Sequence, residues 1–281
     1  MNPAAPSSDW LVPDWPAPAG VQALCTTRAG GVSAVPWDSL NLGDHVGDAA
    51  RAVHENRARL RARMAGAQPV FMRQVHGSDV LVLDGVTTQG LAADACVTLA
   101  PGVACTVMVA DCLPVLFAHA SGAAVAAAHA GWRGLAGTVR AGGRAEGVLE
   151  STFVHFASQL ERAGVARRAD IAGQTLAWLG PCIGPTAFEV GEEVRTALCQ
   201  GNPDAQRHFQ PQPAAGKYLA DLAGLARQRL QALGINAIHG NDGTAPWCTV
   251  GNPSAFFSHR RDAARLGSSG RFAACIWRDP A

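Results

Sequence analysis

Four apolar segments in the middle of the chain constrain the fold more than any other feature. They span residues 95–99, 104–109, 114–119 and 123–129, and short turns containing Gly, Pro or Asp separate them. Segments of this length and composition are typical of buried β-strands. Because further strands are expected before them and most helices after them, the sequence predicts an α/β, α+β-like protein with mixed β-sheet layers flanked by helices.

The remaining elements follow from hydrophobic periodicity and from Gly and Pro positions. Residues 1–20 are rich in proline and predict an irregular lead-in, whereas residues 21–281 show no linker and predict a single catalytic domain. Further strands are expected at 21–27, 70–73, 79–84, 176–179, 235–239 and 271–277. Helices are expected at 49–64, at 135–164 with a break near Gly142-Gly143, at 191–199 and at 219–233.

Charge and cysteine usage exclude several classes of protein. Lys and Arg total 23 against 22 Asp and Glu, and the resulting net charge of +1 gives no strong attraction to nucleic acid or anionic lipid. The longest apolar run, 122–130, is shorter than the roughly 20 residues that span a bilayer. Eight scattered cysteines without a signal-like leader favour reduced thiols and the cytoplasm.

Three side chains at the ends of predicted strands suit metal chemistry. His76 lies in a turn between two strands, Cys112 lies between two apolar strands, and His129 ends a third. Two imidazoles and one thiolate are ligands for zinc, and three protein ligands leave a fourth position open, as in catalytic zinc sites. The spacing equally allows the alternative of a core cysteine beside two hydrogen-bonded histidines.

Several separated motifs resemble the YfiH family, which is also called the laccase-domain or polyphenol-oxidase family and, in bacteria, the peptidoglycan editing factor family. The likeness extends from Val21 to Trp277. One departure is His259, where many relatives have Tyr. The motifs are Arg73-Gln74-Val75-His76-Gly77, residues 110–114, residues 129–134, residues 179–181 with 183–185, residues 27–33, 40–43 and 45–48, residues 258–262, and Gly270-Arg271.

The resemblance implies an enzyme that acts on purine nucleosides. It implies zinc at His76, Cys112 and His129, which would also be the catalytic residues, with copper as an alternative metal. It further implies phosphorolysis of adenosine, inosine and methylthioadenosine, with adenosine deamination as a second activity. Partners would then be a small nucleoside and inorganic phosphate, with neither nucleic acid nor membrane, and the oligomeric state is left open.

Motif side chains away from the metal ligands are candidates for substrate binding. Gly131-Trp132-Arg133-Gly134 follows a predicted ligand, and a helix starting near Gly134 would offer free N–H groups to phosphate, with Arg133 assisting. Other motif residues could hold the ribose or the base, although a structural role is an equal alternative for each. These residues are Arg28, Asn41, His45, Gln74 and Arg260.

Three other functions remain as alternatives. A multi-copper phenol oxidase typically needs His-x-His pairs, but none of the nine histidines lies two residues from another. A cysteine hydrolase or amidase acting in peptidoglycan editing would use Cys112 as nucleophile and His129 or His76 as base, without a metal. A binding module would have no turnover at all.

Overall fold

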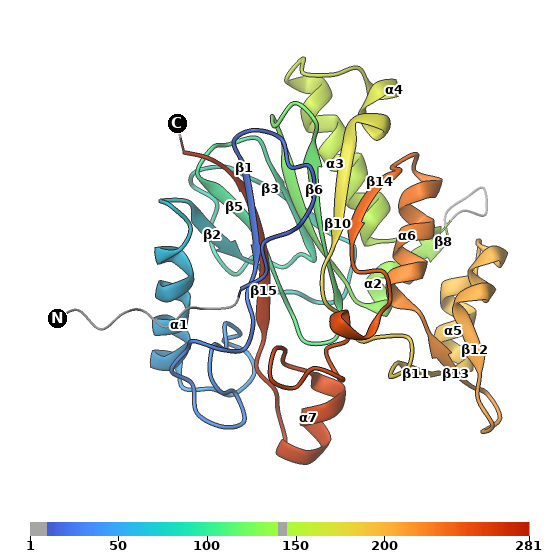
Figure 1. Ribbon diagram of the computed structural model, residues 1–281. Coiled ribbons are helices and arrows are strands. Elements are labelled where there is room, and N and C mark those ends of the chain that lie inside the picture. Colours follow the sequence, from blue (N-terminus) through green and yellow to red (C-terminus); the bar gives the residue numbers. More distant parts are fainter. Residues whose placement is uncertain (1–9, 140–144, 281) are drawn as a thin grey trace.

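The apolar segments pair into two large sheets that pack face to face (Figure 1). The computed structural model describes residues 10–139 and 145–280. Within these residues, a four-stranded sheet has the order β1-β15-β5-β2 and a six-stranded sheet the order β14-β10-β6-β7-β4-β3. The first sheet comprises β1 (Val21–Cys25), β15 (Phe272–Arg278), β5 (Val103–Val109) and β2 (Gln68–Phe71). The second comprises β14 (Ala237–Gly240), β10 (Thr175–Leu179), β6 (Leu113–His119), β7 (Val125–Ala130), β4 (Ala95–Thr98) and β3 (Val80–Leu83).

Both faces of the four central strands of this sheet, β10, β6, β7 and β4, are buried, which explains why they read as nearly continuous apolar runs. Along β6, Val115 and Phe117 face the helices, whereas Leu116 and Ala118 face the four-stranded sheet. All four side chains are fully buried. The period of two along a strand therefore distributes one apolar segment between two cores.

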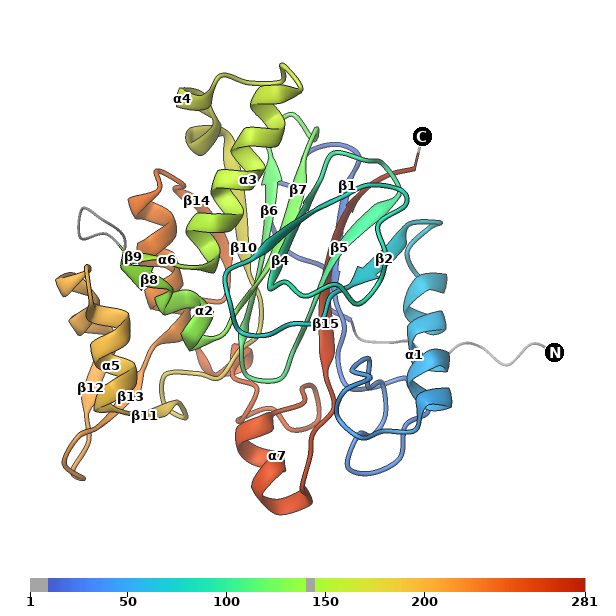
Figure 2. The ribbon, with the colours of Figure 1, turned by 180° about the vertical axis from the view of Figure 1, so that it is seen from behind.

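Helices cover the outer faces of both sheets, so the molecule is layered α/β/β/α (Figures 1 and 2). On the four-stranded sheet, α1 (Ala50–Ala62) packs Leu60 near Phe71 and Met108. The six-stranded sheet is covered mainly by α3 (Val148–Arg162) and α6 (Leu222–Ala232). No helix in the described part of the chain is both long and apolar enough to cross a bilayer. This arrangement confirms the predicted α/β class.

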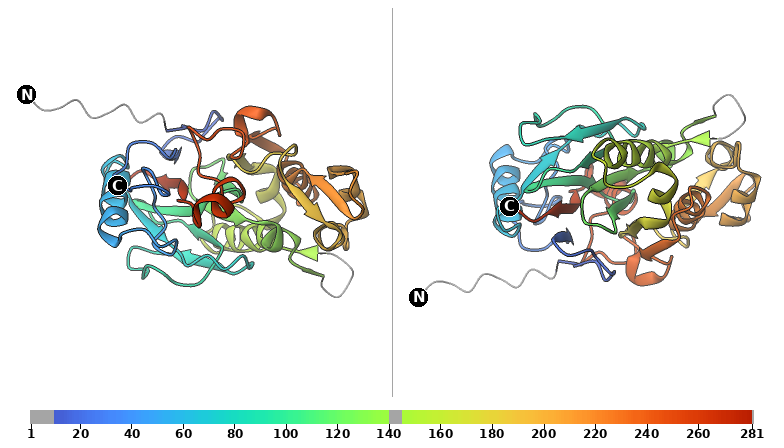
Figure 3. Two further views of the ribbon diagram at one scale, coloured as in Figure 1. Left: turned by 90° about the horizontal axis from the view of Figure 1, so that it is seen from below. Right: turned by 90° about the horizontal axis from the view of Figure 1, so that it is seen from above.

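Smaller elements flank the layers. A three-stranded sheet of β11 (Glu189–Gly191), β13 (Lys217–Ala220) and β12 (Phe209–Pro211) lies beside α5 (Glu192–Cys199). The short α2 (Trp132–Ala136) follows β7, and α4 (Arg168–Ile171) follows α3. Figure 3 shows α7 (His259–Leu266) at one end of the two sheets. Residues 10–20 contain a single bridge, Leu11 with Cys25, and the proposed domain boundary at residue 20 stays a prediction.

The prediction of one long helix over residues 135–164 is wrong. The helix α2 ends at Ala136, two short strands, β8 (Thr138–Val139) and β9 (Ala145–Glu146), pair with each other, and α3 starts only at Val148. Gly137 has a φ of +64°, and a Cβ there would lie 2.0 Å from the Glu146 carbonyl oxygen. Only glycine permits this turn. The expected break at Gly142-Gly143 lies outside the described residues.

Two further differences from the prediction concern helices. The helix expected from residue 219 begins at Leu222, because Lys217–Ala220 pairs as β13 and Asp221 caps the helix by accepting from the Gly224 N–H. Helix α7 is absent from the helices predicted from the sequence. Its apolar residues are too few to show a stripe, but the Ser258 side chain accepts from the Arg261 N–H and starts it.

A buried ion pair ties α3 to α6, and breaking it is expected to destabilise the fold strongly. Arg229 donates to both carboxylate oxygens of Glu150 at 2.8 and 3.0 Å, and Glu150 also accepts from the Gly147 N–H. We expect Glu150→Ala to lower the free energy of unfolding by about 3–5 kcal/mol in urea denaturation, because it leaves a buried guanidinium without its acid. The double variant Glu150→Leu/Arg229→Met should recover most of that loss. Equal instability of the single and double variants would contradict this account.

Candidate metal centre

The three predicted metal ligands meet at one end of the two sheets. His129 lies near the end of β7, Cys112 lies between β5 and β6, and His76 lies in the loop between β2 and β3. Their ligand atoms all lie within 4.8 Å of one another, and the Cys112 Sγ is 3.8 Å from the His76 Nε2. The two imidazole rings meet edge to face at 74°. The structure therefore brings together side chains that are 53 residues apart in sequence, since 129 − 76 = 53.

Strand pairing explains why Cys112 and His129 converge. β6 pairs antiparallel with β7, with Leu113 opposite Ala130, so Cys112 extends this ladder toward Gly131. A Cβ on Gly131 would lie 2.9 Å from the His76 Cδ2 and 3.0 Å from the Cys112 Sγ. Glycine at this position thus leaves room for the thiol and the imidazole to approach each other.

Two non-glycine residues at the site have positive φ angles, an uncommon and costly backbone conformation. His76 has a φ of +62° and Asp111 a φ of +87°. Asp111 belongs to residues 110–112, which carry the chain from the four-stranded sheet to the six-stranded sheet. Its carboxylate accepts from the Thr249 hydroxyl and from the Arg260 N–H, both at 2.6 Å. These contacts hold the crossing in place directly before Cys112.

Asp94 fixes the orientation of both histidine-bearing segments, and sequence reasoning missed it. One of its oxygens accepts from the His129 Nδ1 at 2.8 Å and from the His76 N–H at 2.9 Å. The other oxygen accepts from the N–H groups of Gly77 and Val75 at 2.6 and 3.2 Å. Because Nδ1 donates its proton to Asp94, Nε2 is the nitrogen of His129 that can bind a cation, which would displace any proton from it. The only signal in the sequence was a lone carboxylate among apolar residues.

Cys112 and His129 shift each other's protonation. Burial opposes ionisation of the Cys112 thiol, but His129 and His76 outweigh it and lower its pKa to about 6. Burial also opposes protonation of His129, but Cys112 and Asp94 outweigh it and raise its pKa to about 9. Burial raises the pKa of Asp94 less than its hydrogen bonds with His129 and the loop lower it. The pocket thus favours a thiolate at Cys112, the form in which cysteine binds metals.

The donor set and its spacing fit one divalent cation. Two ligand atoms of a tetrahedral zinc site, bonded at 2.0–2.3 Å, are separated by roughly 3.5 Å, which is close to the 3.8 Å between Sγ and Nε2. The acid behind His129 is the outer-shell partner that metal-binding histidines have. Among the described residues, His76, Cys112 and His129 are the group with this property, and they can hold a metal ion.

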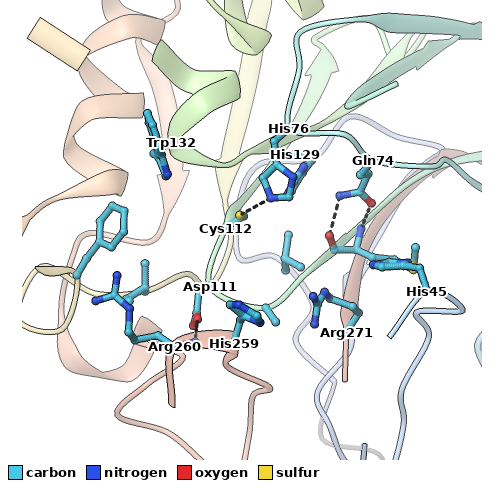
Figure 4. A pocket seen from close by; sticks show the side chains of 15 residues that line it. His45, Gln74, His76, Asp111, Cys112, His129, Trp132, His259, Arg260 and Arg271 are labelled. Carbon is cyan, nitrogen blue, oxygen red and sulfur yellow. Dashed lines mark hydrogen bonds between the residues drawn. The ribbon is translucent and has the colours of Figure 1, made fainter. Parts of the chain in front are cut away.

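The cluster opens into a cavity of about 360 Å³ (Figure 4). Its walls combine apolar and aromatic side chains with several cationic or imidazole groups. The aromatic side chains are Trp132 and Phe188, and the polar residues beyond the cluster are His45, Gln74, Asp111, His259, Arg260 and Arg271. A cavity of this size fits a small organic molecule rather than a polymer.

Three of the predicted substrate residues line this cavity. His45 does so with a lowered pKa, because burial and the nearby Arg271 outweigh the attraction of Asp44. The carboxamide of Gln74 is engaged by the backbone of Met108, which it contacts twice at 2.8 Å. Arg260 donates to the Glu189 carbonyl oxygen at 3.0 Å and so joins α7 to β11. Gln74 and Arg260 therefore line the cavity and also hold neighbouring backbone segments in place.

The other three lie outside the cavity lining. Arg28 forms an ion pair with Asp38 beside a different cavity. The buried side chain of Asn41 forms hydrogen bonds with Gly43, Asp48 and the backbone of Arg271. Arg133 is exposed and rests over the Trp132 ring at 4.3 Å. The helix expected to begin near Gly134 begins at Trp132 and has five residues. Phosphate binding at this helix start stays a prediction.

The fold and the site define the class of this protein, which is a two-sheet α/β protein with a His-Cys-His group able to bind a metal. The chain belongs to the family described as multi-copper polyphenol oxidoreductase laccase, which residues 22–279 match. It is 47% identical over 268 residues to a protein of Pseudomonas aeruginosa named purine nucleoside phosphorylase, covering 95% of this chain and 98% of that one.

Two further similarities place the chain among YfiH proteins. It is 47% identical over 273 residues to the purine nucleoside phosphorylase YfiH of Escherichia coli, covering 96% and 99% of the two chains. The crystal structure of Neisseria meningitidis protein NMB0706 matches with a TM-score of 0.82 at 42% identity, covering 96% and 99%. The resemblance inferred from the motifs is confirmed.

Proposed function

We propose that this protein is a zinc-dependent purine nucleoside phosphorylase. It acts on adenosine, inosine and S-methyl-5′-thioadenosine and releases the free base and a ribose or methylthioribose 1-phosphate. Adenosine deamination is a second activity of the same site. The observation that carries the proposal is the convergence of His76, Cys112 and His129 at the wall of a small-molecule cavity.

The names of the relatives support the reaction, and the donor set supports the metal. Both relatives described above are named purine nucleoside phosphorylases and match nearly the whole chain. Two imidazoles and a thiolate suit zinc, whereas magnesium and calcium prefer oxygen ligands. A multi-copper centre needs more ligand groups than the single cluster present in the described residues. The cytoplasmic location stays a prediction from the sequence.

The chain's own residues prepare the site for these reactions. His76, Cys112 and His129 would hold the ion, and Asp94 keeps His129 turned toward it. When bound, zinc supplies a Lewis acid that polarises a reactant oxygen and lowers the pKa of water toward about 7. The cavity wall at Trp132 and Phe188 offers flat apolar surface of the kind that purines stack on.

One specific observation also suits the cysteine hydrolase alternative. The contact between the Cys112 thiol and the His76 imidazole, together with a thiol pKa of about 6, is what an activated cysteine nucleophile needs. The two functions differ in their need for a metal. Metal removal therefore discriminates between them.

The proposal is tested by product analysis before and after chelation. Purified protein is incubated with adenosine and phosphate, and the products are separated by chromatography. We expect adenine and ribose 1-phosphate from phosphorolysis, inosine from deamination, and hypoxanthine where both reactions occur. Prolonged chelation should remove about one zinc ion per chain and nearly all turnover, and stoichiometric zinc should restore both.

Two outcomes would overturn the proposal. Turnover that persists in metal-free protein would exclude a zinc mechanism and favour Cys112 as a nucleophile. Absence of turnover on all three nucleosides, with and without phosphate, would favour a binding protein. Addition of copper in place of zinc, with a phenol as substrate, tests the oxidase activity that the family description names.

A further inference from the structure

Arg271 is a half-buried arginine of the cavity wall that no acid in the described part of the chain neutralises. Within the same residues, Arg227 and Arg278 are also half-buried without an ion pair, but neither lines the cavity. Arg28, Arg229 and Arg261 each pair with a carboxylate within 3.1 Å. Arg271 is half-buried and lines the cavity, but among residues 10–139 and 145–280 no carboxylate forms an ion pair with it. A cation that lines a cavity, is kept partly out of water and has no acid partner is a candidate for binding an anion.

The surrounding chain holds Arg271 in one position. The buried carboxamide of Asn41 accepts from the backbone N–H groups of Arg271 and Gly43, each at 2.9 Å. The Leu42 N–H donates back to the Arg271 carbonyl oxygen. The side-chain stem of Arg271 passes directly over Gly43, where a Cβ would lie 2.8 Å from the Arg271 Cγ. The structure thus joins two motifs, residues 40–43 and Gly270-Arg271, that the metal site does not use.

The guanidinium keeps donors available toward the cavity. Its Nη1 donates to the carbonyl oxygens of Ser269 and Gly270 at 2.8 and 3.1 Å, and the described contacts assign no protein acceptor to Nε or Nη2. Figure 4 shows Arg271 directed into the cavity between His259 and His45. A fork of N–H donors with fixed charge is the side chain best suited to a tetrahedral oxyanion.

We propose that Arg271 binds the inorganic phosphate that attacks the nucleoside, and that Asn41 and Gly43 are positioning residues for it. This inference rests on the proposed function and deepens it. In the reaction, a phosphate oxygen bonds to C1′ while the glycosidic C–N bond breaks and leaves its electron pair on the base. The proton of hydrogen phosphate ends on the released base, and Arg271 stays charged throughout.

Arg271 replaces Arg133 as the residue expected to bind phosphate. The side chain of Arg133 is exposed and lies on Trp132, outside the cavity lining, where water screens its charge. Arg271 shares the cavity with His76, Cys112 and His129. An anion on Arg271 is therefore in the same enclosed space as a nucleoside near the metal ligands.

The experiment compares Arg271→Gln and Gly43→Ala with the wild type in the zinc-loaded enzyme. Arg271→Gln removes the charge, whereas Gly43→Ala keeps every polar group and displaces the arginine stem. We expect each to raise the KM for phosphate, by about 10- to 100-fold for Arg271→Gln, the range of a lost charge-assisted hydrogen bond. The KM for the nucleoside and the zinc content should change little. Arg61→Gln, an exposed arginine on α1, is the matched control.

A second measurement keeps this inference separate from the proposed function. Isothermal titration with inorganic phosphate reports binding without any turnover, and we expect Arg271→Gln to weaken it by a similar factor. Loss of phosphate binding in the variant supports the inference even if wild-type protein performs no phosphorolysis. A folded, zinc-loaded Arg271→Gln with unchanged phosphate KM and binding would overturn it. So would a raised phosphate KM in Arg133→Ala alone, and if Arg271→Gln does not fold, Gly43→Ala decides.

Discussion

Replacing Cys112 by alanine is expected to abolish metal binding and to lower kcat/KM for nucleosides by about 1,000-fold or more. A Lewis acid contributes several kcal/mol to the reaction, and each 1.36 kcal/mol is a tenfold change in rate. The two imidazoles that remain form a weaker, two-ligand site. Metal content measured by mass spectrometry, together with steady-state kinetics, checks both expectations.

The metal content has to be measured together with the activity, because Cys112→Ala would also inactivate an enzyme that uses Cys112 as its nucleophile. Cys199→Ala is the matched control, since Cys199 is half-buried on α5 and is not part of the metal-binding cluster. We expect the control to retain one zinc ion per chain and full activity. A Cys112→Ala protein that still binds one zinc ion per chain, but has no activity, would argue for the nucleophile instead.

The sequence predicted the strands of the central sheets because burial on both faces leaves a strong compositional signal. The segments expected at 95–99, 104–109 and 114–119 are β4, β5 and β6 within one residue at each end. Their partners could not be read from the chain. β5 and β6 are adjacent in sequence but belong to different sheets, since pairing depends on contacts between distant segments.

Elements without a strong apolar period were the ones missed. β11, β12 and β13 are three or four residues long and only partly buried, so alternation is too brief to recognise. The long helix expected over residues 135–164 resulted from treating an alanine- and glycine-containing segment as helical. The turn at Gly137 is set by the backbone of β9, which no local pattern reveals.

The metal-binding cluster could be proposed from sequence because its chemistry is carried by rare residue types at strand ends. The residues that support it could not. Asp94 was missed, and for Asn41 the motif left substrate contact and a structural role equally open. The hydrogen bonds of Asn41 connect Gly43, Asp48 and the backbone of Arg271, which is 230 residues away. The sequence of a motif does not show whether a polar residue contacts a ligand or forms hydrogen bonds within the protein. Only the contacts in the structure distinguish these two roles.

Among the residues that support the metal-binding cluster, Asp94 is the one whose replacement should weaken zinc binding most, because its carboxylate accepts four hydrogen bonds. Each of its oxygens accepts two, so the position requires an acid that has no donor. In Asp94→Asn the amide nitrogen would face either the N–H groups of Gly77 and Val75 or those of His129 and His76. We expect a 10- to 100-fold loss of zinc affinity, the range found for outer-shell partners of metal-binding histidines.

Asp94→Ala should be worse, because it leaves four donors without an acceptor beside a buried imidazole. Its expected cost is about 3–5 kcal/mol in the free energy of unfolding, in addition to the loss of zinc affinity. Competition with a chromophoric chelator measures the affinity, and urea denaturation measures the stability. Asp79→Asn, at an exposed acid in the loop that carries His76, is the control and should behave as the wild type. Wild-type zinc affinity in Asp94→Asn would show that His129 does not need this acid to bind the ion.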